Sequence, residues 1–226
     1  QLKIKMETEK TPNAHSIVCV LLRVAVFMVL CARHQDGRVS CWGLANYGRS
    51  GSDELVLYQP QEMAAISGAT DIAVGTHAAC YLNAQGEVHC WGRNRYGELG
   101  DNSKETRSTP VRVQGLGAVV AVDIEQYSAC AVTQTGEVWC WGSAGGWRFG
   151  SADITGDQLV PLQVAGISGA VDVSVSSSGG CARLGSGEVL CWGSNWLGQS
   201  GLPWSSPHGP VSVSSLSAVS QVAMEG

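Results

Sequence analysis

Charged residues are scarce in this sequence, and they do not form clusters. Asp, Glu, Lys and Arg make up 15% of the 226 residues, and the formal net charge is −5. The Lys and Arg residues are scattered, which argues against a nucleic-acid-binding surface, because such a surface needs clustered basic residues to displace counterions. Acidic runs are also absent, which excludes a disordered acidic tail. The length is sufficient for a sizeable hydrophobic core.

Glycine is absent from residues 1–36, although the chain holds 29 glycines. Residues 1–16 are polar and charged, and we expect them to form a disordered N-terminal extension. Residues 17–30 are apolar except for Arg23. This run fits the core of a signal peptide, a membrane anchor shorter than the usual length of about 20 residues, or a degenerate first strand. These alternatives stay open at this stage, and Cys19 within the run has no partner at the spacing of the other cysteines.

Helical periodicity is also absent after residue 36, and a repeat takes its place. Four times a cysteine is followed, ten positions later, by a second cysteine and then by Trp-Gly. The second cysteines lie about 50 residues apart, a period typical of solenoids and propellers. The four tryptophans of the Trp-Gly pairs, Trp42, Trp91, Trp141 and Trp192, are expected to be core residues.

Each repeat follows the same plan of short strands and turns. An apolar strand is expected at 70–74, 119–124 and 170–175, followed by a strand with the first cysteine, a turn with Gly, and a return strand that ends at the second cysteine. A Gly-rich arm comes next, and a proline is expected to open the next strand, at Pro60, Pro110, Pro161 and Pro210. The pattern predicts an all-β array with units at about 31–59, 60–109, 110–160 and 161–209, and a partial unit at 210–226.

The paired cysteines predict four disulfides. Two cysteines that flank one tight turn face each other across a hairpin, where their Cα atoms lie about 4.5–5.5 Å apart, within the range that a disulfide accepts. Because such bonds persist only in oxidising compartments, we expect a secreted, periplasmic or cell-surface chain. The expected pairs are Cys31–Cys41, Cys80–Cys90, Cys130–Cys140 and Cys181–Cys191.

A metal site is the competing interpretation of one cysteine pair. His77, Cys80, His89 and Cys90 together offer two imidazoles and two thiols, a set that suits tetrahedral zinc. The other repeats replace His77 with Tyr127 and Ser178, so the set occurs in one unit of the four. We therefore expect neither a metal nor another cofactor.

The second and fourth repeats carry a motif of a known family. Gly86, Val88, Trp91-Gly92, Asn94, Gly97 and Leu99-Gly100 in the second repeat, and Gly187, Val189, Trp192-Gly193, Asn195, Gly198 and Gly201 in the fourth, occur in the same register. This pattern resembles the regulator of chromosome condensation repeat over roughly residues 37–226. The third repeat departs from it, because Ala144 and Trp147 replace the motif Asn and Gly.

The resemblance implies a seven-bladed β-propeller with four-stranded antiparallel blades. Seven units would need about 350 residues, so this chain is expected to form an incomplete arc of about four blades. The chain begins with Gln1 and stops early in a fifth unit, so we expect it to be part of a longer protein. The cysteine pairs are similar to those of the extracellular bacterial members of the family.

Family members differ in function, and a shared fold does not assign one. The founding nuclear protein is a nucleotide-exchange factor for a small GTPase and binds chromatin, and other members are secreted protein inhibitors. No exchange-factor residue maps onto this sequence. We therefore expect a binding module for a protein or glycan partner, with GTPase regulation or a structural segment of a larger surface protein as the alternatives.

The arms between Trp-Gly and proline are the expected binding elements. They cover 44–59, 93–109, 143–160 and 194–209, and equivalent segments of a repeat array fall on one face. Arginine and aromatic residues are enriched at protein interfaces. By contrast, Tyr47 and Tyr96 are expected to pack between blades. The candidate partner-binding residues are Arg93, Arg95, Glu98, Trp147, Arg148, Phe149, Trp196 and Trp204.

No catalytic pattern stands out in the sequence. Glu87, Glu137 and Glu188 recur at one position after the turn, where they are expected to line a solvated hairpin edge rather than form a catalytic pair. A nucleophile elbow is not found, and the Gly-rich segments lack the Lys-Ser/Thr of a phosphate-binding loop. The chain is therefore not expected to be an enzyme.

Overall fold

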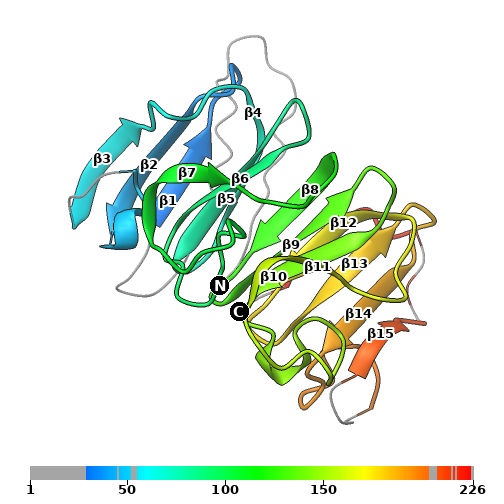
Figure 1. The fold of residues 1–226 in the computed structure, drawn as a ribbon. Helices are drawn as coiled ribbons and strands as arrows, with labels where there is room; N and C mark the ends of the chain where they lie inside the picture. Colours follow the sequence, from blue (N-terminus) through cyan, green and yellow to red (C-terminus); the bar gives the residue numbers. More distant parts are fainter. Residues whose placement is uncertain are drawn as a thin grey trace.

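The fold is an arc of antiparallel sheets, which we call blades (Figure 1). The computed structural model describes residues 29–44, 46–51, 55–203, 208–214, 216 and 218–224. Within these residues, fifteen strands form one three-stranded and three four-stranded sheets, and two 3-10 turns are the helical elements. The all-β prediction is therefore confirmed.

The blades follow one another along the chain. Blade 1 holds β1 (Val29–Arg33), β2 (Val39–Leu44) and β3 (Val56–Glu62), with η1 (Asn46–Gly48) after β2. Blade 2 holds β4 (Ala69–Val74), β5 (Ala78–Asn83), β6 (Val88–Gly92) and β7 (Arg107–Arg112). Blade 3 holds β8 (Val119–Ile124), β9 (Ser128–Thr133), β10 (Val138–Gly142) and β11 (Gln158–Gln163), with η2 (Gly145–Trp147) after β10. Blade 4 holds β12 (Ala170–Val175), β13 (Gly179–Leu184), β14 (Val189–Gly193) and β15 (His208–Ser212).

The sequence suggested that the prolines open the first strands of the next units, but the structure places them elsewhere. Pro110 lies inside β7, the outermost strand of blade 2, and Pro161 lies in the same place in β11. Each outer strand pairs with the return strand of its own blade, and the register shifts at the same point, between Cys90 and Gly92 in blade 2. Proline is tolerated there because an edge strand with a bulge can spare one N–H donor. The blades are thus offset by one strand from the units read from the sequence.

The hydrophobic core lies at the interfaces between successive blades. Between blades 2 and 3, the buried side chains of Leu82, Val88 and Leu99 pack against Ile124 and Trp141. Similar clusters join blade 1 to blade 2 and blade 3 to blade 4. Because each blade covers the apolar face of its neighbour, stability depends on the stacking of the blades.

The four predicted disulfides are confirmed, one in each blade. The register sets each pair of cysteines directly opposite, for example Cys80 against Cys90, with Cα atoms 4.0–4.1 Å apart. The carbonyl of Val88 accepts a hydrogen bond from the amide of Val113, on the side of β6 that faces away from β5. Val88 therefore forms a non-hydrogen-bonded pair with β5, and so does Cys90, which lies two residues later on the same strand. Cα atoms come closest in such pairs. Because Cys80 and Cys90 bond to each other, neither is a thiolate ligand for zinc.

Several expectations concern residues outside the described ranges. These are the disordered extension at 1–16, Cys19 and most of the apolar run at 17–30, of which Val29 and Leu30 begin β1. At the other end, Val219, Val222 and Met224 pack against the Cys181–Cys191 disulfide of blade 4. The first strands of blades 3 and 4 cover the preceding blade in the same way.

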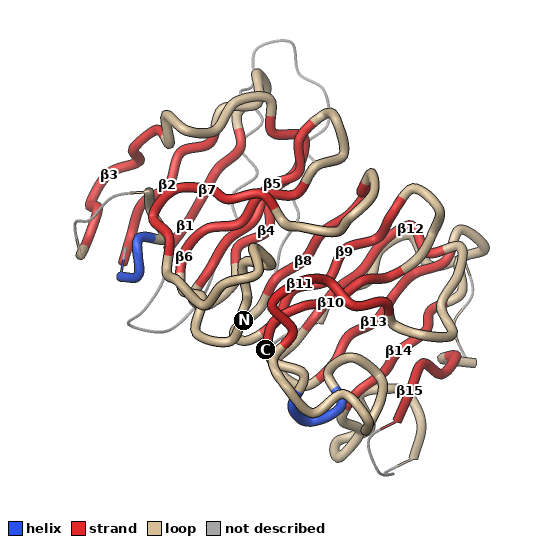
Figure 2. The backbone as a smooth tube through the Cα atoms, in the orientation of Figure 1, coloured by secondary structure: helices blue, strands red, loops and turns tan. Residues whose placement is uncertain are grey.

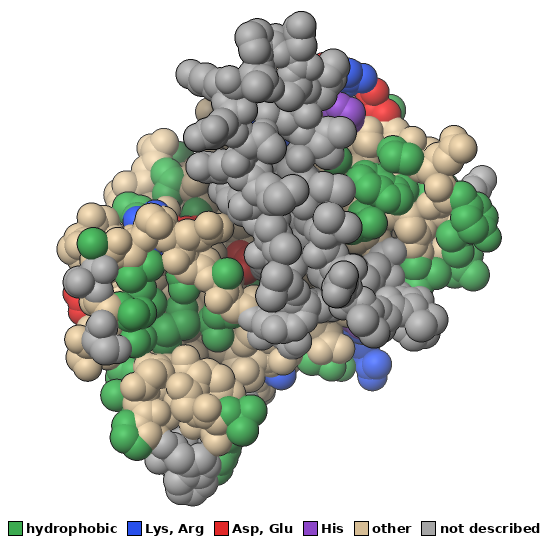
Figure 3. Space-filling model, turned by 180° about the vertical axis from the view of Figure 1, so that it is seen from behind, with side chains coloured by type: hydrophobic (Ala, Val, Ile, Leu, Met, Phe, Trp, Pro, Cys, Tyr) green, Lys and Arg blue, Asp and Glu red, His purple; other side chains and the backbone are tan. Residues whose placement is uncertain are grey.

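The described surface carries few charged side chains on the side shown in Figure 3, where most of the visible area is apolar or uncharged. Among the described residues, no helix has the length and apolar character needed to cross a bilayer.

Candidate functional site

The arms lie at the ends of the blades opposite the hairpin turns. Each arm begins where the return strand ends, and this end is the one farther from the hairpin turn. Figure 2 shows η1 and η2 at corresponding ends of their sheets. The turns between the first and second strand of each blade, at 75–77, 125–127 and 176–178, lie on the same side. We call this side the arm face and the opposite side the hairpin face.

In blades 2, 3 and 4, the Trp of the Trp-Gly pair donates a hydrogen bond to the arm of the preceding blade. Trp91 donates its indole Nε1–H to the carbonyl of Arg49 (2.7 Å), Trp141 to that of Glu98 (2.8 Å), and Trp192 to that of Arg148 (2.8 Å). All three acceptors occupy the seventh position after the preceding Trp. The three indoles are buried, as expected, whereas Trp42 of blade 1 is partly exposed. The arms of blades 1, 2 and 3 are thus each tied to the next blade by a buried hydrogen bond.

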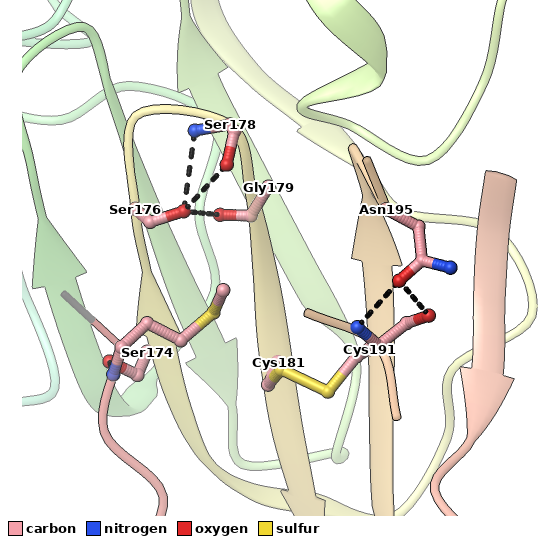
Figure 4. Close-up of a disulfide and its surroundings, with 9 residues drawn as sticks. Ser174, Ser176, Ser178, Gly179, Cys181, Cys191 and Asn195 are labelled. Carbon is pink, nitrogen blue, oxygen red and sulfur yellow. Dashed lines mark hydrogen bonds between the residues drawn. A yellow bond between two sulfur atoms is a disulfide. The ribbon is translucent and has the colours of Figure 1, made fainter. Parts of the chain in front are cut away.

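The motif asparagine organises the interior of its arm. Asn94 accepts a hydrogen bond from the amide of Leu99 (3.0 Å) and donates to the carbonyl of Ser103 (3.1 Å). Asn195 accepts hydrogen bonds from both the amide and the hydroxyl of Ser200. Figure 4 shows Asn195 together with the Cys181–Cys191 disulfide. In the third arm, Ala144 cannot make these bonds, but the arm keeps the hydrogen bond from Gly150 to Trp147 that corresponds to the one from Gly100 to Gly97.

Arginine and tyrosine side chains alternate along the arm face of blades 2 and 3. The guanidinium of Arg95 lies 5.4 Å from the ring centre of Tyr96, and that of Arg93 lies 5.4 Å from Tyr96 and 5.9 Å from Tyr127. On the far side of Tyr127, the guanidinium of Arg148 lies 5.2 Å from its ring centre. We call Arg93, Arg95, Tyr96, Tyr127 and Arg148 the arginine stripe.

The sequence profile of the regulator of chromosome condensation (RCC1) repeat matches residues 85–132, and a second profile of the same repeat matches residues 69–98. These residues hold the hairpin and arm of blade 2 and the first strands of blade 3. Residues 69–132 of this chain therefore carry RCC1 repeats. No curated protein sequence matches the chain.

Solved structures of RCC1-type propellers share the fold of this chain at low identity. Human WBSCR16 matches with 22% identity and a TM-score of 0.70, over 80% of this chain and 49% of that one. Yeast RCC1 (Prp20) bound to Kap60 matches with 17% identity and a TM-score of 0.74, over 91% and 50%. Prp20p from Saccharomyces cerevisiae, in a study of its binding to Gsp1p and histones, matches with 17% identity and a TM-score of 0.73, over 91% and 52%. This RCC1-repeat chain therefore spans about half the length of these structures.

Some of the candidate residues are exposed on the arm face of the RCC1-repeat arc. Arg95 is exposed, and the side chain of Trp196 is 52% exposed. Arg93, Trp147 and Arg148 are half-buried. Trp204 lies outside the described residues. The exposed and half-buried residues remain candidates for contact with a partner.

Glu98 and Phe149 need correction as partner-binding candidates. Phe149 is 2% exposed because it occupies the motif Leu position, where the buried Leu99 stands in the second repeat. Glu98 is 1% exposed, and its carboxylate accepts hydrogen bonds from the amide of Tyr96 (2.6 Å) and from Arg93 Nε (3.3 Å). Burial raises the pKa of Glu98. Both side chains support their arms from inside.

Two contributors to the arm face were missed in the sequence. Tyr127 was noted only as the counterpart of His77, and Arg49 was not considered. Tyr127 contacts Tyr96, and His77 contacts Tyr47, edge to face at 5.7 and 5.8 Å, so both tyrosines of the arms pack against the turn of the next blade as expected. The alignment of His77 with Tyr127 was visible in the sequence. What it could not show was that this turn lies beside the preceding arm.

His77 makes stability depend on pH. Burial, with Arg93 and Arg49 nearby, lowers its pKa from 6.5 to about 4. As the pH falls below 6.5, His77 becomes protonated in the unfolded chain, whereas in the folded chain it stays neutral down to about pH 4. The stability that neutral His77 contributes is therefore fully present above pH 6.5 and is lost as the pH falls from 6.5 to about 4. We expect His77→Tyr, with the residue found at this position in blade 3, to lose less stability between pH 7 and pH 5 than the wild type. Urea unfolding at both pH values measures this, and equal losses in the two proteins would contradict it.

Trp147 occupies a backbone position that glycine fills in the other three repeats. Its φ is 68°, close to the values of 70°, 86° and 79° at Gly48, Gly97 and Gly198. A side chain in this left-handed region costs about 1–2 kcal/mol. We therefore expect Trp147→Gly to be more stable than Trp147→Ala by about 1 kcal/mol, because both variants lack the indole and only alanine keeps the strain.

Trp196 provides the matched control for this comparison, because its backbone is not left-handed. There the glycine variant should be no more stable than the alanine variant. Thermal and urea unfolding of the four variants measure both differences. Alanine equal to or better than glycine at position 147 would show that the backbone there is not strained.

Proposed function

We propose that this chain is a non-enzymatic binding module that works in an oxidising compartment and recognises a protein partner through its arm face. The observation that carries the proposal is the arginine stripe, on arms that buried tryptophans tie to the next blade. Arginine and aromatic side chains on a preorganised surface are the groups that supply most of the binding energy at protein interfaces.

The compartment is inferred from the four disulfides. Each of the four described blades has one, and disulfides are rare in proteins of the reducing cytosol. A secreted, periplasmic or cell-surface location is therefore part of the proposal.

Site-specific photo-crosslinking tests which face binds. A photoreactive amino acid at Arg95 on the arm face is compared with one at Gln85, an exposed residue of the hairpin turn of the same blade. The probe is the protein fraction outside the cytosol of the source cells. We expect one defined protein adduct from position 95 and none from position 85. Adducts from position 85 alone, or none from either position, would refute the proposal, and adducts that carry only carbohydrate would indicate a glycan partner.

Regulation of a small GTPase is the second candidate. The observation in its favour is the fold shared with Prp20p, a protein studied for its binding to Gsp1p. A nucleotide-release assay with a small GTPase from the source organism distinguishes the candidates. Acceleration of release by the chain would favour this second function over an exported binding module.

A further inference from the structure

The arginines of the arm face differ from the other basic residues in how their charge is balanced. The other described Arg and Lys side chains mostly lie against carboxylates, both on the arms (Lys104 against Asp157, Arg107 against Asp101 and Glu105) and away from them (Arg38 against Asp36 and Glu62, Arg112 against Glu87, Arg183 against Asp172). Of the described arginines that form no ion pair, Arg33 lies in β1, Arg49 is buried at 1% exposure, and Arg95 and Arg148 lie on the arm face. Arg95 and Arg148 therefore place positive charge without a counter-charge on the arm face of a protein whose net charge is −5.

Aromatic rings, rather than carboxylates, hold the guanidinium groups of the stripe. Tyr96 lies against both Arg93 and Arg95, and Tyr127 against both Arg93 and Arg148. A ring face attracts and orients a guanidinium but leaves its charge in place. The stripe is therefore positioned for an anion that is not part of the described chain.

The buried Glu98 does not neutralise the stripe. It pairs with Arg93 alone, at 3.3 Å, and Arg93 Nη2 still has no hydrogen-bond partner among the described residues. Arg148 donates hydrogen bonds to the carbonyls of Ser177 and Gly145 and to the hydroxyl of Ser143, and none of these acceptors carries a formal charge. Arg95 is exposed and makes no such bonds within the described chain.

The position of the stripe on two arms favours an extended ligand over a small anion. A pocket lined by Gly86, Glu87, Arg112 and Gly117 lies on the hairpin face, and its arginine is already paired with Glu87 at 3.1 Å. The stripe itself runs along two neighbouring arms, those of blades 2 and 3. A ligand that engages it must present several negative groups along its length.

We propose that the arginine stripe binds an acidic segment of a protein partner through the carboxylates of its Asp and Glu side chains. This inference rests on the proposed function and specifies the partner chemistry. Carboxylates match the planar fork of arginine in two-pronged hydrogen bonds. The acidic remainder of the chain repels the same segment, so the charge distribution also sets its orientation on the arm face.

Charge reversal at two arginines tests the proposal. The probe is a fluorescein-labelled deca-glutamate peptide, measured by fluorescence anisotropy with the full chain at low salt. Arg95→Glu should weaken binding about tenfold, whereas Arg112→Glu on the hairpin face changes the net charge equally and should weaken it less than twofold. Binding should also fall about tenfold or more as salt rises from 20 to 300 mM, because exposed charges are screened.

The outcomes separate this inference from the proposed function. No peptide binding, or equal loss in the two variants, would overturn the acidic-segment proposal, and binding of heparin without the peptide would replace it with a sulfated glycan. The proposed function would survive these results if crosslinking at position 95 still captured a protein. Both variants should unfold at the wild-type temperature within a few degrees, which excludes misfolding as the cause.

Discussion

Replacement of Cys130 and Cys140 with alanine is expected to lower the free energy of unfolding by about 3 kcal/mol. The disulfide closes a loop of about 11 residues, and its removal releases that constraint on the unfolded chain. Both cysteines are almost fully buried, 1% and 0% exposed, at the interface with blade 4. The loss should be large relative to a total stability of about 5–15 kcal/mol.

Urea unfolding under oxidising and reducing conditions measures this effect. Dithiothreitol should destabilise the wild type by more than the double variant loses, because it opens all four disulfides. The variant should also lose further stability in dithiothreitol, through its three remaining bonds. A loss below about 1 kcal/mol in the variant, with no effect of dithiothreitol on the wild type, would show that the hairpins do not depend on their disulfides.

Trp141→Ala is the second variant with a large expected effect, a loss of about 3–5 kcal/mol. The indole is completely buried between blades 2 and 3, and its Nε1–H is bonded to the carbonyl of Glu98. The substitution opens a cavity and leaves a buried acceptor without its donor. It should also loosen the arm that carries Arg93 and Arg95, so binding through the arginine stripe is expected to weaken together with stability.

Two further variants separate the causes of this loss. Trp141→Phe keeps most of the volume but removes the hydrogen bond, so it should lose less than Trp141→Ala. Trp196→Ala removes an indole that is 52% exposed and should change stability by less than about 1 kcal/mol. If Trp196→Ala lowered the free energy of unfolding as much as Trp141→Ala, the distinction between buried, hydrogen-bonded tryptophans and exposed ones would be wrong.

The repeat made most of the fold predictable from the sequence. The first strands of blades 3 and 4 were expected at 119–124 and 170–175, and the structure has β8 and β12 at these bounds. Four copies of one cysteine spacing around one turn also fixed the disulfide pairing. These features are local, because strand, turn and opposed cysteines lie within a dozen residues of each other.

The prediction failed where the answer depends on contacts between blades. Pro110 and Pro161 were assigned to the wrong side of a blade boundary, because the sequence does not show which strand the proline strand pairs with. Phe149 was read as a surface aromatic, although its register with the buried Leu99 pointed to the core. Tyr127 was missed because its role arises only where the turn of blade 3 meets the arm of blade 2.

Closed disulfides are the basis of the proposed location outside the cytosol, and differential alkylation tests them most directly. The native protein is isolated from its source in the presence of iodoacetamide, then reduced, labelled with a second alkylating reagent and analysed by mass spectrometry. The eight cysteines of the four hairpins should carry only the second label, and the unreduced peptides should show each cysteine linked to its partner across one turn. The first label on these cysteines in folded protein would contradict both the disulfides and the proposed compartment.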